Sequence, residues 1–266
     1  MKIWANTIVN NEDRFIWFSI MSIIDYVDKI LIYDTGSQDS TIKIIEEIEK
    51  IKKNKIIIRK MGEVDASGLT KLRQTMLEES DCDWIILLDG DEVWWDESIK
   101  KLVEKINWEG QDLDAIVVPT MIPVGDIYHM QEEKAGQYQI LGRKGHFNLR
   151  AINKRIPNLH VDDTPYPLEG YRGKNNQLIQ ESKKTIFLDT PYLHVTHLER
   201  SSTRRKFDKS KYELGDKISK NFKFPAVLYQ DRPFFVPSPW VKISGKSLIL
   251  SKLLTPLRKI KRRIMT

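Results

Sequence analysis

The stretch that decides the fold is DWIILLDGDE, at residues 83–92. Its uninterrupted apolar run is typical of a strand buried on both faces of a parallel sheet. Asp89, Gly90 and Asp91 follow at once, and alternate residues of an extended chain point the same way. Two carboxylates aimed at one place repel each other unless a cation or a proton lies between them. A magnesium or manganese ion is the natural solution, so the stretch predicts a metal-using ligand site at a strand end.

Strands and helices alternate through the first half of the chain. Apolar runs predict strands at residues 3–9, 29–33, 55–59 and 115–119, and helical spacing predicts helices at 15–24, 44–51, 69–79 and 96–106. This alternation predicts an α/β fold with a mainly parallel sheet and helices on both of its faces. Ligands of such sheets bind at the carboxyl ends of the strands.

The second half of the chain is less regular. Glycines and prolines separate short segments after Pro119, of which residues 146–152 and 185–188 are strand-like and residues 200–220 are predicted to be helical. We expect an irregular region that is built onto the same sheet and determines substrate specificity.

Composition and charge exclude several classes of protein. The 266 residues include 43 Lys and Arg against 37 Asp and Glu, but eight of the basic residues and none of the acidic ones lie after residue 240. The remaining body has a net charge of −2, which argues against a nucleic-acid partner. A single cysteine, Cys82, excludes an internal disulfide and a multi-cysteine zinc site. No signal peptide and no apolar stretch of about 18 residues is present, so we expect a cytoplasmic protein.

Three elements together resemble the family 2 glycosyltransferases of the GT-A fold. They are Asn11-Glu12 after the first strand, DTGSQDST at residues 34–41 after the second, and WIILLDGDE at residues 84–92. The second element fits the family pattern D-x-G-S-x-D-x-T at every fixed position, and the third fits an apolar strand followed by D-x-D-E. The resemblance implies transfer of a hexose-type sugar from a nucleotide sugar, most often a UDP-sugar. It also implies a direct displacement that inverts the anomeric centre.

The resemblance assigns roles to the residues at the strand ends. Asp34 would bind the uridine, and Val9 and Glu12 would flank the base. Asp89 would approach the ribose or the sugar, with Gly90 letting the ligand come close, and Asp91 would ligate the metal on the diphosphate.

Further candidates come from outside these strand ends. The family often has Ala-Arg-Asn before the D-x-D strand, and here Leu72-Arg73-Gln74 makes Arg73 a candidate nucleotide-binding residue. A His-Glu pair that often follows in the family is replaced here by residues 160–165, HVDDTP. Asp162 and Asp163 are the candidate catalytic bases, with Glu169 in reserve.

Two histidines lie within YLHVTHLERS, at residues 192–201. By resemblance, His194 or His197 would complete the metal site, and the sequence does not choose between them. A histidine beside a carboxylate suits manganese better than magnesium. The basic side chains of Arg200, Arg204, Arg205 and Lys206 follow and are candidates to close over the diphosphate.

The C-terminal tail has a pattern of its own. Apolar residues recur at spacings of 3, 4, 3 and 4 among basic ones, at Leu250, Leu253, Leu257, Ile260 and Ile264. Such a basic amphipathic helix suits an anionic membrane surface and would bring the enzyme to a lipid-linked acceptor. Docking on the body or on a dimer partner is the alternative. We therefore expect residues 1–120 to bind the nucleotide sugar, 121–230 to bind a glycan or lipid-linked acceptor, and 231–266 to form the tail.

Other functions remain open at this stage. Asp89 to Val93 also fits the D-x-D-x-[TV] motif of haloacid-dehalogenase-like phosphatases, although that motif normally follows the first strand. A non-catalytic module that binds a nucleotide or a glycan is a second alternative. The sequence does not reveal the sugar, the acceptor or the oligomeric state.

Overall fold

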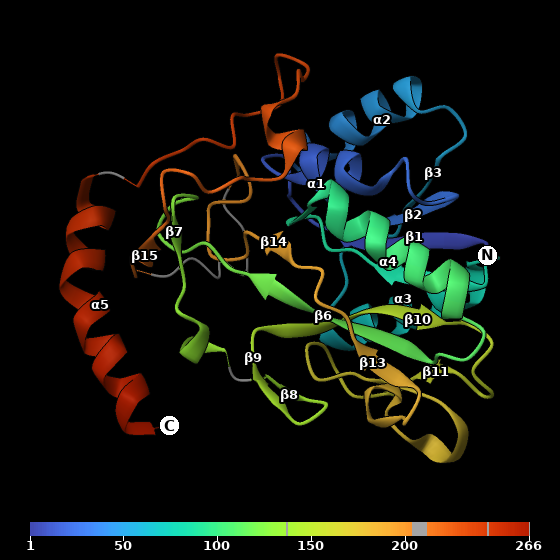
Figure 1. The fold of residues 1–266 in the computed structure, drawn as a ribbon. Coiled ribbons are helices and arrows are strands. Elements are labelled where there is room, and N and C mark those ends of the chain that lie inside the picture. Colours follow the sequence, from blue (N-terminus) through green and yellow to red (C-terminus); the bar gives the residue numbers. More distant parts are fainter. Residues whose placement is uncertain (137, 204–211, 244, 266) are drawn as a thin grey trace.

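The computed structural model describes residues 1–136, 138–203, 212–243 and 245–265. Their main sheet has nine strands in the order β3-β2-β1-β4-β10-β6-β14-β5, with β13 pairing on β6 (Figure 1). The strands are β1 (Ile3–Val9), β2 (Lys29–Asp34), β3 (Ile56–Lys60), β4 (Trp84–Leu87), β5 (Glu92–Trp94), β6 (Ala115–Met121), β10 (Phe147–Asn153), β13 (Thr185–Phe187) and β14 (Tyr192–His194).

Five α-helices and three small ribbons complete the described structure. The helices are α1 (Ile16–Ile23), α2 (Thr41–Ile51), α3 (Ala66–Glu79), α4 (Asp96–Glu109) and α5 (Gly245–Met265). The ribbons pair β7 (His129–Met130) with β15 (Asp216–Lys217), β8 (Tyr138–Ile140) with β9 (Arg143–Gly145), and β11 (His160–Val161) with β12 (Tyr171–Arg172). Four short 3₁₀ turns lie between them, at Glu133–Ala135, Lys174–Asn176, Ile179–Glu181 and Ala226–Tyr229.

The sheet is mainly parallel, as predicted. β1 lies between β2 and β4 and is parallel to both, and β3 extends this parallel set. β10 runs antiparallel between β4 and β6, and β5 runs antiparallel to β14. The second half of the chain thus adds strands to the sheet that the first half begins.

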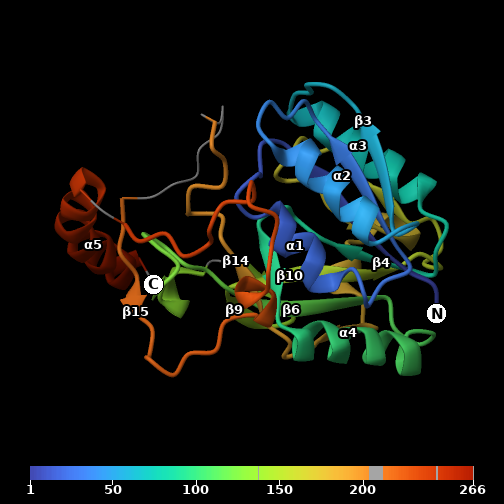
Figure 2. The ribbon, with the colours of Figure 1, turned by 90° about the horizontal axis from the view of Figure 1, so that it is seen from above.

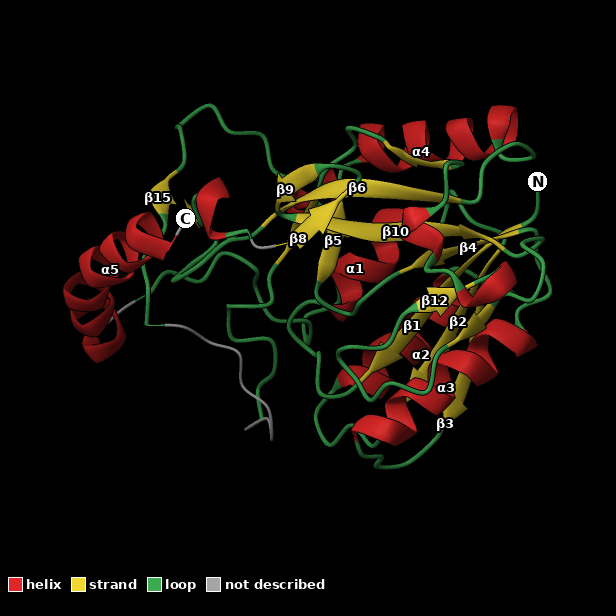
Figure 3. Ribbon diagram, turned by 90° about the horizontal axis from the view of Figure 1, so that it is seen from below, coloured by secondary structure: helices red, strands yellow, loops and turns green. Residues whose placement is uncertain are grey.

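Helices cover both faces of the sheet (Figure 3). In β2, alternate residues pack on opposite faces of the sheet. Ile30 and Ile32 pack against buried residues of α1, α2 and α4. Leu31 and Tyr33 pack against residues of α3. This period of two is why β2 and β4 are mostly apolar, since both of their faces are buried.

Two local expectations need correction. α3 begins at Ala66, earlier than predicted, because Asp65 caps it by accepting the backbone N–H of Gly68 at 2.7 Å. The helix predicted over 200–220 is wrong in its described parts, since residues 200–203 and 212–220 contain only turns and the short strand β15. Arg200, Glu213 and Asp216 form ion pairs with distant segments instead. Residues 204–211, with Arg204, Arg205 and Lys206, lie outside the described residues.

The tail forms one helix, α5, at the edge of the molecule and away from the main sheet (Figures 1 and 2). Pro256 lies inside it. Across the described ranges, no helix has the length and apolar character that crossing a membrane requires. The division of the chain at 120 and 230 stays a prediction, and the first boundary falls within β6.

Candidate active site

Three strand ends meet at one edge of the sheet. Val9, the last residue of β1, is in register with Asp34, the last residue of β2. On the other side of β1, Leu88 follows β4 and donates its backbone N–H to the carbonyl of Asn6 at 3.0 Å. The two acidic motifs therefore leave the sheet on either side of β1, where the strand-end rule predicts a ligand.

The loop after β2 is built around Asp34. This buried carboxylate accepts the backbone N–H groups of Gly36 at 3.2 Å and of Ser37 at 3.2 and 3.3 Å. Gly36 has a φ of 89°, a conformation that glycine adopts at little cost. Asp34 thus shapes its own turn, and its contact with uridine stays a prediction.

The segment after β1 is tied to the same loop. The Asn11 side-chain oxygen accepts the backbone N–H of Gln38 at 2.7 Å and that of Asp39 at 3.2 Å. Glu12 donates its backbone N–H to the Thr41 hydroxyl oxygen at 2.7 Å. These bonds make one rigid unit of the first two motifs, and they place the Glu12 side chain next to Gly90. A Cβ at Gly90 would lie 2.9 Å from Glu12 Cγ, so the glycine admits this side chain.

Asp91 is enclosed by positive charge. Its side chain is 1% exposed, it forms an ion pair with Arg200, and its Oδ1 lies 3.4 Å from His194 Nε2. Arg200 Nη1 also lies 3.3 Å from Glu12 Oε1, which links the acidic motif to the segment after β1. Burial alone would raise the pKa of Asp91, but Arg200 and His194 hold that pKa well below its usual range.

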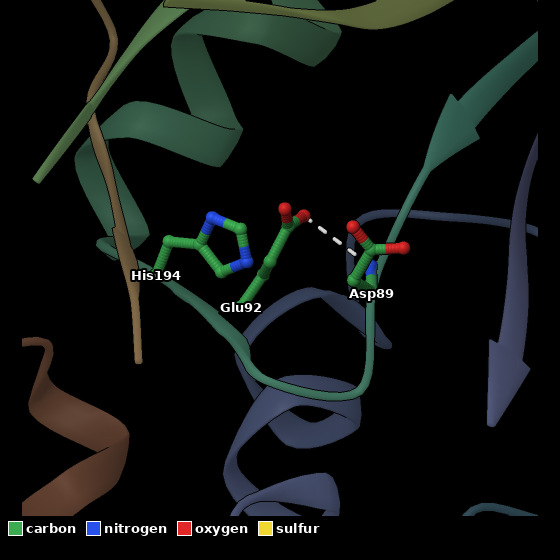
Figure 4. Close-up of side chains that lie close together, drawn as sticks. All are labelled: Asp89, Glu92 and His194. Carbon is green, nitrogen blue, oxygen red and sulfur yellow. Dashed lines mark hydrogen bonds between the residues drawn. The ribbon is translucent and has the colours of Figure 1, made fainter. Parts of the chain in front are cut away.

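A second buried ion pair lies beside the first and was not predicted. Glu92 is fully buried and bound by Arg150 of β10. Its Oε2 also accepts the backbone N–H of Asp89 at 3.3 Å (Figure 4). Burial raises the pKa of Glu92 to about 7, against the opposing effect of Arg150. Two sequence features could have indicated this pair. Glu92 directly follows the D-x-D motif, and Arg150 is the one arginine within the strand-like run 146–152.

Asp89 is the more open acid of the motif. Its side chain is 39% exposed, and Arg150 Nη2 lies 3.4 Å from its Oδ2. Burial acts to raise the pKa of Asp89, but Arg150 and Arg73 outweigh it and the pKa is lowered. The carboxylate is therefore ionised and partly exposed to solvent.

The donor set fits a divalent cation. Ligand atoms of Asp89, Glu92 and His194 lie within 4.8 Å of one another (Figure 4). Asp91 Oδ1 is buried beside His194, and no described residue donates a well-aligned hydrogen bond to it. A buried carboxylate oxygen without such a donor is costly, and a metal ion would satisfy it.

Arg73 and Glu169 lie on the α3 side of this site. Arg73 Nε lies 2.7 Å from Glu169 Oε1, and the Glu169 side chain is only 7% exposed. Burial acts to lower the pKa of Arg73, but Tyr171, Asp89 and Glu169 outweigh it and the pKa is raised. Arg73, which the sequence predicts as a nucleotide-binding residue, thus acts electrostatically on Asp89. Its ion pair also places Glu169, the reserve candidate base, near Asp89.

The two candidate bases are held differently. Asp162 accepts Arg172 Nε at 2.7 Å and the backbone N–H of Thr164 at 3.1 Å. Burial acts to raise the pKa of Asp162, but these hydrogen bonds lower it. Asp163 is exposed. Both assignments stay predictions.

The two histidines separate in space. His194 ends β14, where it is in register with Glu92 and beside Asp91. His197 instead lines a cavity of about 400 Å³ whose lining includes Arg14 and Asp126 but none of the D-x-D-E acids. The structure therefore favours His194 over His197 as a metal ligand.

The sequence model described as "Glycosyl transferase family 2" matches residues 7–173, which include all three motifs. The chain belongs to this family. The phosphatase interpretation also fails on topology, because Asp89 follows the fourth strand in chain order and not the first. No curated protein matches the chain.

Two structures of TarS support the fold, and another protein is similar at a lower score. S. aureus TarS is 15% identical, with a TM-score of 0.51, covering 74% of this chain and 37% of that one. S. aureus TarS 1–349 in complex with UDP-GlcNAc is 13% identical, with a TM-score of 0.51, covering 79% of this chain and 60% of that one. Glucosyl-3-phosphoglycerate synthase from Mycobacterium tuberculosis, in complex with Mn²⁺, UDP-glucose and phosphoglyceric acid, is 14% identical, with a TM-score of 0.44, covering 73% of this chain and 71% of that one. The predicted GT-A fold is confirmed, and the chain spans about three fifths of TarS 1–349.

Proposed function

We propose that the protein is a metal-dependent glycosyltransferase that moves a sugar from a UDP-sugar to an acceptor hydroxyl with inversion. The observation that carries the proposal is the meeting of Asp34, Asp89 and Asp91 at adjacent strand ends, with His194 beside the last of them. Membership of family 2 supports transfer of a sugar. The similar fold of TarS 1–349, solved with UDP-GlcNAc, supports a uridine nucleotide as carrier.

The donor would lie across the strand ends. Val9, Glu12 and Asp34 would hold the nucleoside, because the unit that they form is already fixed by backbone hydrogen bonds. Asp89 would accept a hydroxyl of the ribose or the sugar, since it is the exposed acid of the motif. Arg73 would keep Asp89 ionised for this role.

Asp91 and His194 would hold a divalent cation, manganese in preference to magnesium, together with Asp89 or Glu92. Bound there, the cation would stabilise negative charge on the departing diphosphate. Arg200 already neutralises one oxygen of Asp91, so Oδ1 is the oxygen left for the metal.

We propose Glu169 as the first choice of catalytic base, ahead of Asp162 and Asp163. A base must reach the acceptor hydroxyl, and Glu169 pairs with the arginine that acts on Asp89. Both acids are paired with an arginine, but hydrogen bonds from Arg172 and Thr164 lower the pKa of Asp162, which makes it a weaker base than an unperturbed aspartate. In the step, the acceptor oxygen bonds to the anomeric carbon and its proton passes to Glu169. The nucleoside diphosphate leaves with the electrons of the broken bond.

Calorimetric titration of the full chain with UDP and UDP-sugars, with and without Mn²⁺, tests the proposal. We expect binding that requires the metal, and weakening by about 100-fold in both Asp91→Asn and His194→Gln. Asp81→Asn is the matched control, because Asp81 is an exposed acid paired with Lys2 at the other end of β4. Circular dichroism checks that each variant folds.

Two outcomes contradict the proposal. One is UDP binding that is equally tight without metal. The other is a folded Asp91→Asn variant that still hydrolyses or transfers the donor sugar at the rate of the unchanged protein.

A further inference from the structure

The apolar row of α5 faces solvent. Its five members, spaced along the whole helix, are between 41% and 79% exposed: Leu250, Leu253, Leu257, Ile260 and Ile264. Scattered exposed apolar residues need no explanation, but a continuous row along one face indicates an interaction surface. We call this row the outer face of α5.

The opposite face of α5 docks on the body through polar groups. Ser251 is fully buried, and the Thr255 hydroxyl oxygen accepts the backbone N–H of Leu214 at 2.8 Å. Arg262 lies 2.7 Å from Glu132 and 2.6 Å from Glu213, and Lys259 lies 2.6 Å from Asp216. A surface helix of a globular protein normally buries its apolar stripe and exposes its charges. In α5 this arrangement is reversed, so burial against the body does not explain the outer face.

The charge around the outer face selects its partner. Lys252, Lys261 and Arg263 are exposed and flank the apolar row, and residues 241–266 contain no acidic side chain. Two copies of α5 packed face to face would bring basic flanks together, which is unfavourable. An anionic lipid surface satisfies both features, because the apolar row enters the acyl boundary while the flanking cations contact the headgroups.

We propose that α5 binds an anionic membrane surface with its outer face while its polar face stays docked on the body. Figures 1 and 2 show α5 at the outer edge of the molecule, with its long side away from the main sheet. The fixed docking then sets how the catalytic site stands relative to the membrane. Combined with the proposed function, on which this last step rests, the acceptor is a hydroxyl-bearing molecule at that surface.

Sedimentation of the full chain with vesicles tests the proposal. Vesicles of phosphatidylcholine with a quarter phosphatidylglycerol are compared with vesicles of phosphatidylcholine alone. We expect binding to the anionic vesicles that weakens in high salt, and partitioning that falls about 100-fold in Leu253→Asn with Leu257→Asn. Ile51→Asn with Trp108→Asn is the matched control, since these residues are 54% and 78% exposed on α2 and α4.

Three results overturn the proposal: no binding of the unchanged protein to anionic vesicles, equal binding by the Leu253 and Leu257 variant, or loss of binding in the matched control. A dimer seen by light scattering that dissociates in that variant, with no vesicle binding, assigns the outer face to a second copy. Calorimetric binding of UDP, measured in parallel without lipid, separates this test from that of the proposed function.

Discussion

The candidate active site has two parts that are built differently. Its floor consists of the strand ends and loops that carry Val9, Asp34, Asp89 and Asp91, all within the first 91 residues. Its wall consists of side chains from α3, β10, β14 and the segments after β11 and β14, chiefly Arg73, Arg150, Glu169, His194 and Arg200. The floor is held by hydrogen bonds to nearby backbone, whereas the wall is held by ion pairs between side chains.

This difference separates two kinds of contribution. In the proposed function, the floor binds the donor, since its acids leave adjacent strands of one sheet. The wall shifts the pKa values of those acids, and the proposed base Glu169 belongs to it. Changes in the floor should therefore mainly weaken donor binding, whereas changes in the wall should lower turnover or the free energy of unfolding.

The substitution Glu169→Gln gives the largest expected effect and tests whether a change in the wall lowers turnover without weakening donor binding. Removing a general base lowers turnover by about 10² to 10⁴, and the neutral isostere keeps the shape of the side chain. We expect kcat to fall by about 10³ with little change in the affinity for UDP, measured by release of UDP in the presence of acceptor. Asp162→Asn is the matched control and should keep turnover within a few fold. If Asp162→Asn is inactive and Glu169→Gln is active, then Asp162 is the base and Glu169 is not.

The substitution Arg150→Met tests whether an ion pair of the wall contributes to the free energy of unfolding. It leaves the buried Glu92 without its counter-charge, and breaking a buried pair on one side costs about 3–5 kcal/mol. We expect a loss of this size in the free energy of unfolding from urea titrations at pH 8, because Glu92 without Arg150 must either stay buried as a lone charge or take up a proton on folding. The double variant Arg150→Met with Glu92→Leu should recover most of the loss, because no charge is then buried alone. A single variant within 1 kcal/mol of the unchanged protein would contradict a structural role for this part of the wall.

Sequence patterns predicted the floor and named most wall residues as candidates, but they missed Arg150 and gave none of the ion pairs that hold the wall. The strands β1, β2 and β4 and their acidic loops follow from apolar runs and turn residues that lie next to one another in the chain. Arg150 lies within a run that predicts a strand, but its partner Glu92 is 58 positions away. Nothing local indicates that pairing. The choice between His194 and His197 likewise depends on β14 pairing with β5, a long-range contact.

The error in predicting a helix over residues 200–203 and 212–220 has the same origin. Its charged residues favour a helix on local propensity, yet Arg200 binds Asp91 and Glu213 binds α5. Such tertiary contacts outweigh the few tenths of a kcal/mol that separate helix propensities. Short-range signals therefore fix where the strands end, and long-range ion pairs fix what faces those ends.

The smallest expected effect is that of Asp162→Asn, which tests whether Asp162 only stabilises the loop after β11. Asp162 has a pKa lowered by its hydrogen bonds to Arg172 and Thr164, so its folded pKa lies below that of the unfolded chain. Such a group stabilises the fold above an unfolded pKa of 3.8, and the contribution is lost as the pH falls through the lower folded pKa. We expect Asp162→Asn to lower the free energy of unfolding by about 1–2 kcal/mol at pH 7. The deficit should shrink as the pH falls from 3.8 through the lower folded pKa of Asp162, because the side chain is then neutral in both proteins. Chemical unfolding at pH 7, 5 and 3 measures it, and a deficit that does not vary with pH would show that the carboxylate charge is not what holds the loop.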